Sequence, residues 1–364
     1  MRTVGVEEEF LLVGPSGDPV AVAAAVLGTT PDSSDGHDQG AGLQAELQQQ
    51  QLETGTRPCD DLADLARQIR DGRAVAQVAA AAAGASIAAL ATSPLPVAST
   101  VTEAPRYRRI HREFALTARE QLTCGCHVHV AVQSDEEGVA VIDRIGPWLA
   151  PLLALSASSP FWQGVDSGYA SYRSQVWNRW PTAGPTATFG SASAYHASVD
   201  ALVESGTILD RGMVYFDARL SARYPTVEVR IADVCLDADD ATLLAGLVRG
   251  LVETAAHEAA TGRPPAGSRV EHLRAASWRA ARSGLSGMLV HPLTGRPVGS
   301  AVAVDALVEH VRDALEETHD LDLAHELLER LRVRGTGADA QRAWFRAGGD
   351  LSEVVRRAAL ATLA

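Results

Sequence analysis

The sequence predicts an α+β fold with a largely antiparallel sheet and a helical C-terminal third. Strand patterns in the first two thirds are separated by irregular lengths of chain, which does not fit a regular βαβ winding. After Val234 the strand patterns stop and helical patterns follow. The length of 364 residues allows one or two domains. We expect a single domain over residues 1–364, sheet-rich at 1–235 and helical at 236–364.

Each expected element has its own local pattern. Alternating or β-branched residues bounded by turn residues predict strands at 3–13, 44–54, 86–92, 122–132, 213–218 and 225–234. Apolar residues at helical spacing predict helices at 60–84, 105–121, 136–156, 192–205, 237–261, 270–282, 302–318, 324–332 and 339–363.

Two segments are expected to be loops. Residues 28–42 are rich in Gly, Asp and Gln without periodicity, which is typical of a flexible loop. Residues 158–190 are rich in Gly, Ser and Pro and are also aromatic, so they are expected to form a lid or a binding wall. The aromatic side chains of this segment are Trp162, Tyr169, Tyr172, Trp177 and Trp180.

Composition excludes several classes of protein. With 45 acidic and 32 basic residues the net charge is −13, which repels nucleic-acid phosphates and anionic lipid. Neither nucleic acid nor membrane is therefore expected as a partner. The sequence contains no lysine, so it cannot form a Walker A loop, a Schiff base, a protein-kinase site or a Ser-x-x-Lys site. Gly-x-Ser-x-Gly and His-Glu-x-x-His are also absent.

A cytoplasmic location is expected. The start, MRTVGVEEEF, is acidic where a signal peptide would be apolar. The cysteines lack paired spacing, so no disulfide framework is indicated. The most apolar stretch, 74–91, is mostly alanine interrupted by Gln77 and Ser86, which favours a buried helix running into a strand over a membrane span.

The opening strand carries two acids on one face. Because side chains alternate along a strand, Glu7 and Glu9 point to one side and Glu8 to the other. Carboxylates about 7 Å apart along a strand can each reach a metal ion. The alternative is an edge strand whose acids face water.

A second polar face lies at 226–232. Val227, Val229 and Ile231 are predicted to face the core, leaving Glu228 and Arg230 side by side on the other face. They could form a simple ion pair, or a metal ligand beside a phosphate clamp, since guanidinium suits phosphate oxygens.

The run Cys124-Gly-Cys-His-Val-His129 does not fit a zinc site. In a strand, His127 and His129 share one face while Cys124 and Cys126 share the other, so four ligands cannot converge. The thiols are expected to pack as buried apolar groups. One histidine can join the polar face as a ligand or phosphate partner, and a purely structural histidine is the alternative.

Two further acids, Glu46 and Glu53, lie seven residues apart in an amide-rich segment. A regular strand sends them to opposite faces, so both can serve one site only if a bulge or bend intervenes, and Glu53 is the better candidate. A sheet face carrying carboxylates, a histidine and an arginine suits Mg²⁺ or Mn²⁺ holding nucleotide phosphates.

Four segments of the sequence stand out as motifs. They are Val4-Gly-Val-Glu-Glu-Glu-Phe10, Gln121-Leu-Thr-Cys-Gly-Cys-His-Val-His129, Ser159-Pro-Phe-Trp-Gln-Gly164 and Thr226-Val-Glu-Val-Arg-Ile-Ala-Asp233. Together they resemble the bacterial carboxylate-amine ligases of the glutamate-cysteine ligase type 2 group, and the resemblance extends over most of the chain, from residue 3 to about residue 300. It implies a glutamine-synthetase-like fold, with a curved antiparallel sheet, helices packed on one side, and ATP and metal ions on the concave face.

The resemblance also implies roles for single residues. Glu228 and Arg230 would be catalytic, with Arg230 on the transferred phosphate. The implied substrate-binding residues are Arg173, His129 and Trp177. Of these, Arg173 would bind the carboxylate of the substrate. The implied metal ligands are Glu7, Glu9, Glu53 and perhaps Glu46 around one ion, with His127 and Glu228 serving the ion nearest the phosphoryl group.

The implied reaction has two steps. The γ-carboxylate of glutamate attacks the γ-phosphoryl group of ATP to give an acyl phosphate, and an amine, cysteine by family name, then displaces phosphate to form γ-glutamylcysteine. ATP and Mg²⁺ or Mn²⁺, small-molecule substrates and a homodimer are expected with it. Two alternatives stay open: a phosphotransferase acting on a guanidine or another small acceptor, and a catalytically silent binder of nucleotide or amino acid.

Overall fold

A computed structural model describes residues 1–28 and 42–364 of the chain. Its main sheet, in the part described, has seven strands with every pairing antiparallel. The strand order is β2-β3-β1-β5-β9-β8, and β4 also pairs with β1. The main-sheet strands are β1 Val4–Val13, β2 Gly42–Ala45, β3 Gln51–Gly55, β4 Ser86–Ala88, β5 Gly125–Ala131, β8 Ala218–Leu220 and β9 Thr226–Asp233. Two short hairpins add β6 Phe161–Trp162 with β7 Val165–Asp166, and β10 Met288–Val290 with β11 Pro297–Gly299.

Helices account for most of the remaining described chain. Several begin where the sequence supplies a capping acid or serine, as at α2, where the side chain of Asp61 accepts a hydrogen bond from the amide of Asp64. The helices are α1 Ala23–Gly28, α2 Leu62–Ala82, α3 Pro105–Arg119, α4 Asp135–Ile145, α5 Leu149–Ser156, α6 Arg173–Trp177, α7 Ala192–Glu204, α8 Ala238–Ala260, α9 Val270–Ser283, α10 Ser300–His310, α11 Arg312–Glu317, α12 Leu321–Arg334, α13 Gly337–Gly348 and α14 Leu351–Ala361, with 3-10 turns η1 Gly146–Trp148 and η2 Arg211–Met213.

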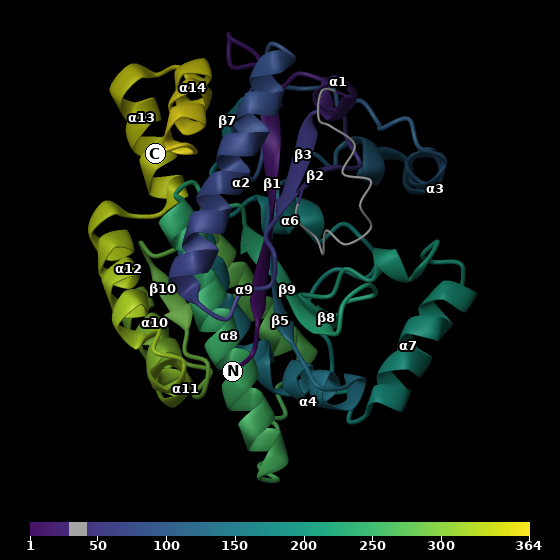
Figure 1. Ribbon diagram of the computed structural model, residues 1–364, viewed down its shortest axis with the longest axis vertical. Helices are drawn as coiled ribbons and strands as arrows, with labels where there is room; N and C mark the ends of the chain where they lie inside the picture. Colours follow the sequence, from purple (N-terminus) through teal and green to yellow (C-terminus); the bar gives the residue numbers. More distant parts are fainter. Residues whose placement is uncertain (29–41) are drawn as a thin grey trace.

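One face of the sheet is covered by helices. Val6, Val128 and Val229 on the central strands belong to one buried cluster with Leu65 of α2 and Leu244 of α8. In Figure 1, α2 runs lengthwise along β1, the C-terminal helices α10 to α14 stand on one side of the molecule, and α3 and α7 stand on the other. The expected α+β class, with a largely antiparallel sheet and a helical C-terminal third, is confirmed.

The segment 44–54 was expected to be one strand, and that prediction is wrong. It is a hairpin, β2 and β3, joined through Glu46 to Gln50. The glutamine run explains the tight connection, because its amides bond the backbone of other segments. Gln48 donates to the carbonyl of Ala118 and Gln51 to that of Thr123, both at 2.7 Å. A buried polar run is stable only when its groups are paired in this way.

Other boundaries also differ from expectation. The predicted strand 213–218 holds the end of η2 and the first residue of β8. The helices expected at 302–318 and 339–363 are each divided in two, the second at Gly349, whose φ of 67° ends a helix readily. The expected loop 28–42 lies almost entirely outside the described residues, and 158–190 contains β6, β7 and α6.

In the described chain, one helical stretch, Asp135–Ser156, is long and apolar enough to cross a membrane by length and composition. Its most apolar window is 72% buried inside the protein, as expected of a core helix pair. All four cysteines are free and buried, which confirms their apolar packing.

Candidate active site

The uncovered face of the sheet forms the floor of a hollow of about 830 Å³. Its walls come from α3 through Tyr107, from α7 through Val203, and from the aromatic segment through Trp177 and Trp180. This volume lies within the range of about 300–1,000 Å³ that small-molecule sites occupy. The hollow therefore has the size of a nucleotide or substrate site.

Strand register explains why the acids gather on this floor. Glu9 of β1 lies opposite Glu53 of β3, and Glu7 lies opposite His127 of β5. One strand further, His129 lies opposite Glu228 of β9. Residues directly opposite in antiparallel strands point to the same face. The predicted alternation is thus confirmed: Glu7, Glu9, His127, His129, Glu228 and Arg230 all line the hollow, whereas Glu8 pairs with Arg73 inside the core.

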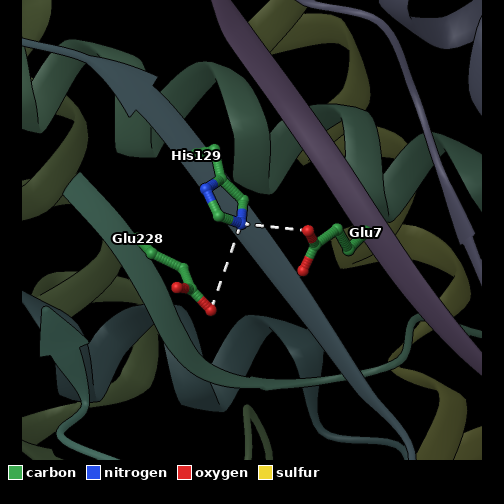
Figure 2. A group of neighbouring side chains, drawn as sticks. All are labelled: Glu7, His129 and Glu228. Atoms are coloured by element: carbon green, nitrogen blue, oxygen red, sulfur yellow. Dashed lines mark ion pairs between the residues drawn. The ribbon is translucent and has the colours of Figure 1, made fainter. Parts of the chain in front are cut away.

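Glu7, His129 and Glu228 converge from three neighbouring strands, as Figure 2 shows. The Nε2 atom of His129 lies 3.4 Å from Glu7 Oε1 and 4.0 Å from Glu228 Oε1. The Nδ1 atom lies 3.0 Å from Thr226 Oγ1, which orients the ring. His129, expected to bind substrate, thus stands beside Glu228 with its Nε2 lacking a hydrogen-bond partner in the described chain.

Two more donor groups occur among the described residues. Glu7, Glu53 and His127 form one, and Glu9, Glu46 and Glu53 form the other, each with its donor atoms within 4.8 Å of one another. The hairpin is the bend that brings Glu46 to the same side as Glu53. Glu9 is also fixed by the amide of Gly125, which donates to its Oε2 at 2.6 Å.

The three acids of that last group repel one another. Burial, followed by the charge of Glu46, raises the pKa of Glu9 to about 8. Burial and the charges of Glu46, Glu7 and Glu9 raise the pKa of Glu53 well above its ordinary value. A bound cation would reduce the electrostatic repulsion between these carboxylates.

Around Glu228, neighbouring arginines and histidines lower the pKa of the carboxyl instead of raising it. Burial opposes ionisation, but Arg230 and Arg219 outweigh it and hold the pKa of Glu228 well below its ordinary value. Arg219 donates to both carboxylate oxygens, at 2.7 and 3.1 Å, and Arg230 donates to Oε1. Burial, then the charge of Arg230, lowers the pKa of His127 to about 4, so its imidazole is neutral at pH 7.

These residues fit divalent cations. Neutral imidazole and carboxylate oxygens are ligands for Mg²⁺ or Mn²⁺. The Nε2 atoms of His127 and His129 are buried without a hydrogen-bond partner in the described chain, which is costly unless something binds there. The grouping differs from the implied one in that His129, rather than His127, belongs with Glu228.

Arg173 and Trp177 lie where two cavities adjoin. Trp177 lines both the large hollow and a smaller cavity of about 330 Å³, whereas Arg173 lines only the smaller one. Both Arg173 and Arg230 lie over the ring of Trp177, with their guanidinium carbons 5.3 and 5.5 Å from its centroid. Of the aromatic loop, only Trp177 and Trp180 form a wall of the large hollow, because Trp162, Tyr169 and Tyr172 pack elsewhere.

Sequence reasoning missed Arg219. It lies opposite Glu228 on β8, but the strand predicted there ended at residue 218, one residue too early. It also missed Arg106, whose guanidinium donates to Asp210 at 2.8 and 2.9 Å at the edge of the hollow. No motif marks Arg106, because its partner is 104 residues away.

Comparisons with known proteins agree with the geometry. Residues 3–359 match the family described as Glutamate-cysteine ligase family 2. A protein of Streptomyces avermitilis, provisionally named glutamate–cysteine ligase 2-1, is 54% identical over 356 residues, covering 98% of each chain. A similarly named protein of Streptomyces coelicolor is 52% identical over 356 residues, covering 98% of this chain and 97% of the relative.

Solved structures share the fold. The glutamate–cysteine ligase of Francisella tularensis, in complex with AMP, matches with a TM-score of 0.70 at 14% identity, over 100% of this chain and 89% of that one. A bifunctional glutathione synthetase from Pasteurella multocida matches with a TM-score of 0.69 at 18% identity. That match covers 99% of this chain and 52% of the bifunctional protein.

Proposed function

Because this chain belongs to glutamate-cysteine ligase family 2, it is an ATP-dependent carboxylate-amine ligase, and we propose that it joins the γ-carboxylate of glutamate to an amine in the large hollow. The observation that carries the proposal is the presence of three clusters of carboxylate and imidazole side chains on one sheet face beside Arg230. Cysteine is the proposed amine, after the names of the relatives. The products are then γ-glutamylcysteine, ADP and phosphate.

The chain's own residues act by position and charge. Arg230 is nine-tenths buried, is ionised at any working pH and faces the hollow. There its positive charge neutralises the oxygens of the phosphoryl group while that group is transferred. Glu228 fixes that guanidinium, and Arg219 fixes Glu228. Trp177 and Trp180 form an apolar wall of the site, which limits the access of water that would hydrolyse the acyl phosphate. No protein nucleophile is needed, in keeping with the absence of lysine.

Glu7, Glu9, Glu46, Glu53, His127, His129 and Glu228 would hold the cations, Mg²⁺ or Mn²⁺. When bound, such ions neutralise phosphate oxygens and orient the nucleotide. We also propose a cytoplasmic location, a single catalytic domain and a homodimer, which follow from the sequence and the family resemblance.

Product identification tests the proposed function. Purified protein is incubated with ATP, Mg²⁺ and glutamate, alone and with cysteine or a panel of other amines, while ADP and phosphate are measured and products are identified by mass. We expect amine-dependent phosphate release and a γ-glutamyl amide. A stable phosphorylated acceptor would instead identify a phosphotransferase, and nucleotide binding without any product would identify a silent binder.

Glu228→Gln provides the matched test of the site. Loss of one charge beside Arg230 should lower the ligation rate by at least about 100-fold, the scale at which preorganised charge contributes. Glu204→Gln, a change at an exposed acid ending α7, should leave the rate unchanged. Circular dichroism of both variants checks folding, and wild-type turnover in a folded Glu228→Gln sample would contradict the assignment.

A further inference from the structure

Two of the four sequence motifs meet at one buried carboxyl group. Asp233 ends the motif on β9 that carries Glu228 and Arg230, and Ser159 begins the motif that leads into β6. Asp233 is 0% exposed, and its Oδ2 atom accepts a hydrogen bond from Ser159 Oγ at 2.7 Å. Neither residue lines the large hollow or the smaller cavity beside it, so neither has a place in the reaction as described above.

The carboxylate of Asp233 holds both ends of the segment 158–171, which precedes α6. At one end its Oδ2 atom also accepts a hydrogen bond from the amide of Ser158, at 2.9 Å. At the other end its Oδ1 atom accepts one from Ser171 Oγ, at 2.8 Å. A buried carboxylate is stable only when its oxygens are paired in this way. The same three hydrogen bonds therefore pay the cost of burying Asp233 and fix the segment against the end of β9.

Ser159 connects this anchor to α6. The amide of Arg173, the first residue of α6, donates to Ser159 Oγ at 3.0 Å. The hydroxyl therefore accepts from the helix and donates to Asp233, which fixes its direction. The first amides of a helix have no partner within the helix, so this hydrogen bond anchors the start of α6. The same helix carries Trp177, and the guanidinium groups of Arg173 and Arg230 both lie over its ring.

Helix α13 holds the segment from its other side. Gln341 of α13 is 1% exposed, and its side-chain amide donates to the carbonyl of Ser158 at 2.9 Å. A methyl group at Gly337 would lie 2.4 Å from Ser158 Oγ, so α13 packs against the segment without spare room. The position of residues 158 and 159 is thus set by Asp233 on the sheet side and by α13 on the opposite side.

We propose that Asp233 is a positioning residue for the ligation reaction, acting through Ser159 to hold the start of α6. The inference rests on the proposed function and extends it to two residues that line neither cavity. Without the Ser159 hydroxyl, the amide of Arg173 and one oxygen of Asp233 each lose a hydrogen-bond partner. Arg173 and Trp177 move with α6, whereas Arg230 belongs to β9. A shift of α6 therefore changes how these side chains face Arg230 across the site.

Kinetics of Ser159→Ala and Asp233→Asn test the proposal. Ser159→Ala removes one hydroxyl and adds no bulk. We expect its kcat/KM for glutamate to fall about tenfold, since a misplacement of about 1 Å can cost up to about 100-fold, while the KM of ATP stays unchanged. Asp233→Asn should lower kcat/KM at least as much, and Ser159→Ala keeps the proposal testable if Asp233→Asn does not fold.

Ser156→Ala is the matched control. Ser156 is 3% exposed, and its hydroxyl accepts a hydrogen bond from the backbone amide of Asp233 at 3.3 Å. Among the described residues it has no hydrogen bond to the segment 158–171. Both serine variants should lose a similar amount of stability in urea. If the role of Ser159 were only structural, the folded protein would keep wild-type kinetics in both.

Hydrogen exchange followed by mass spectrometry gives a readout that does not depend on turnover. Amides of residues 171–177 should exchange about tenfold faster in Ser159→Ala, as expected for losing one hydrogen bond, and at the wild-type rate in Ser156→Ala. Equal kcat/KM of the two serine variants, or unchanged exchange at 171–177, would overturn the proposal. If the wild-type chain forms no amide product, the proposed function fails by itself. Exchange then still decides whether Asp233 holds α6 through Ser159: faster exchange supports that role, and unchanged exchange refutes it.

Discussion

Single residues in the hollow are tuned by neighbours on adjacent strands. Glu9 and Glu228 are both carboxylates on one sheet face, yet their pKa values move in opposite directions. Burial among other acids raises the first, whereas two guanidinium groups outweigh burial and lower the second. The floor therefore has an acid-rich part around Glu9 and an arginine-paired part around Glu228.

Binding of Mg²⁺ should release protons at pH 7. With a pKa of about 8, Glu9 is mostly protonated at that pH, and Glu53 is shifted the same way, so a cation must displace their protons. His127, with a pKa of about 4, is already neutral and contributes none. Apparent affinity should accordingly rise with pH as Glu9, with its pKa of about 8, loses its proton. Calorimetry in buffers of different ionisation enthalpy measures the release, and a value of zero at pH 7 would refute this account.

At the scale of elements, strand β5 joins the proposed cation-binding side chains to the smaller cavity that Arg173 lines. A methyl group at Gly125 would lie 2.3 Å from the Nη2 atom of Arg173 and 3.0 Å from His127 Nε2. The absence of a side chain at Gly125 is thus what lets the guanidinium of Arg173 approach the sheet. The backbone of Gly125 needs no special conformation, since its φ is not positive.

Gly125→Ala should fold but lose activity. The added methyl group displaces Arg173, the proposed substrate-binding arginine, and a misplacement of about 1 Å can cost up to about 100-fold in rate. We expect kcat/KM to fall about 10- to 100-fold. Gly5→Ala on neighbouring β1 is the control, because its methyl group would lie 3.7 Å from Thr56 Oγ1, an ordinary contact. Equal kinetics of the two variants, with unchanged circular dichroism, would show that the space at Gly125 has no role.

At the scale of the whole molecule, one buried arginine joins the ends of the chain. Arg73 of α2 donates to Glu8 on β1 and to the carbonyls of Cys235, Leu236 and Thr362. It thus contacts the first strand, the junction between the sheet-rich and helical parts, and the residue after α14. This network supports the expectation that residues 1–364 unfold as one domain.

Arg73→Leu should destabilise the entire chain. Glu8, 2% exposed, would keep a buried charge without its partner, which costs about 3–5 kcal/mol of unfolding free energy. Arg70→Leu, one turn earlier, removes a half-exposed ion pair with Asp239 and should cost about 0–1 kcal/mol. Urea titrations followed by circular dichroism and tryptophan fluorescence measure both. Separate transitions for the two probes would argue against a single domain.

The sequence by itself determined the fold class, the order of the main strands along the chain and the face on which each strand presents its acids. That is so because the alternation of side chains along a strand is local, and it placed Glu7, Glu9, His127, Glu228 and Arg230 together correctly. The four motifs carried the family assignment, which the comparisons confirm.

Only the tertiary structure decided what depends on pairing between distant segments. The hairpin that brings Glu46 beside Glu53, the partnership of Arg219 with Glu228, and the placement of Arg173 outside the large hollow all follow from strand register and packing. Asp217 and Arg274 carry no sequence signal at all, because they line the same cavity only where the start of β8 approaches α9. Local periodicity fixes which way a side chain points, whereas only packing of distant segments fixes which other side chains it meets.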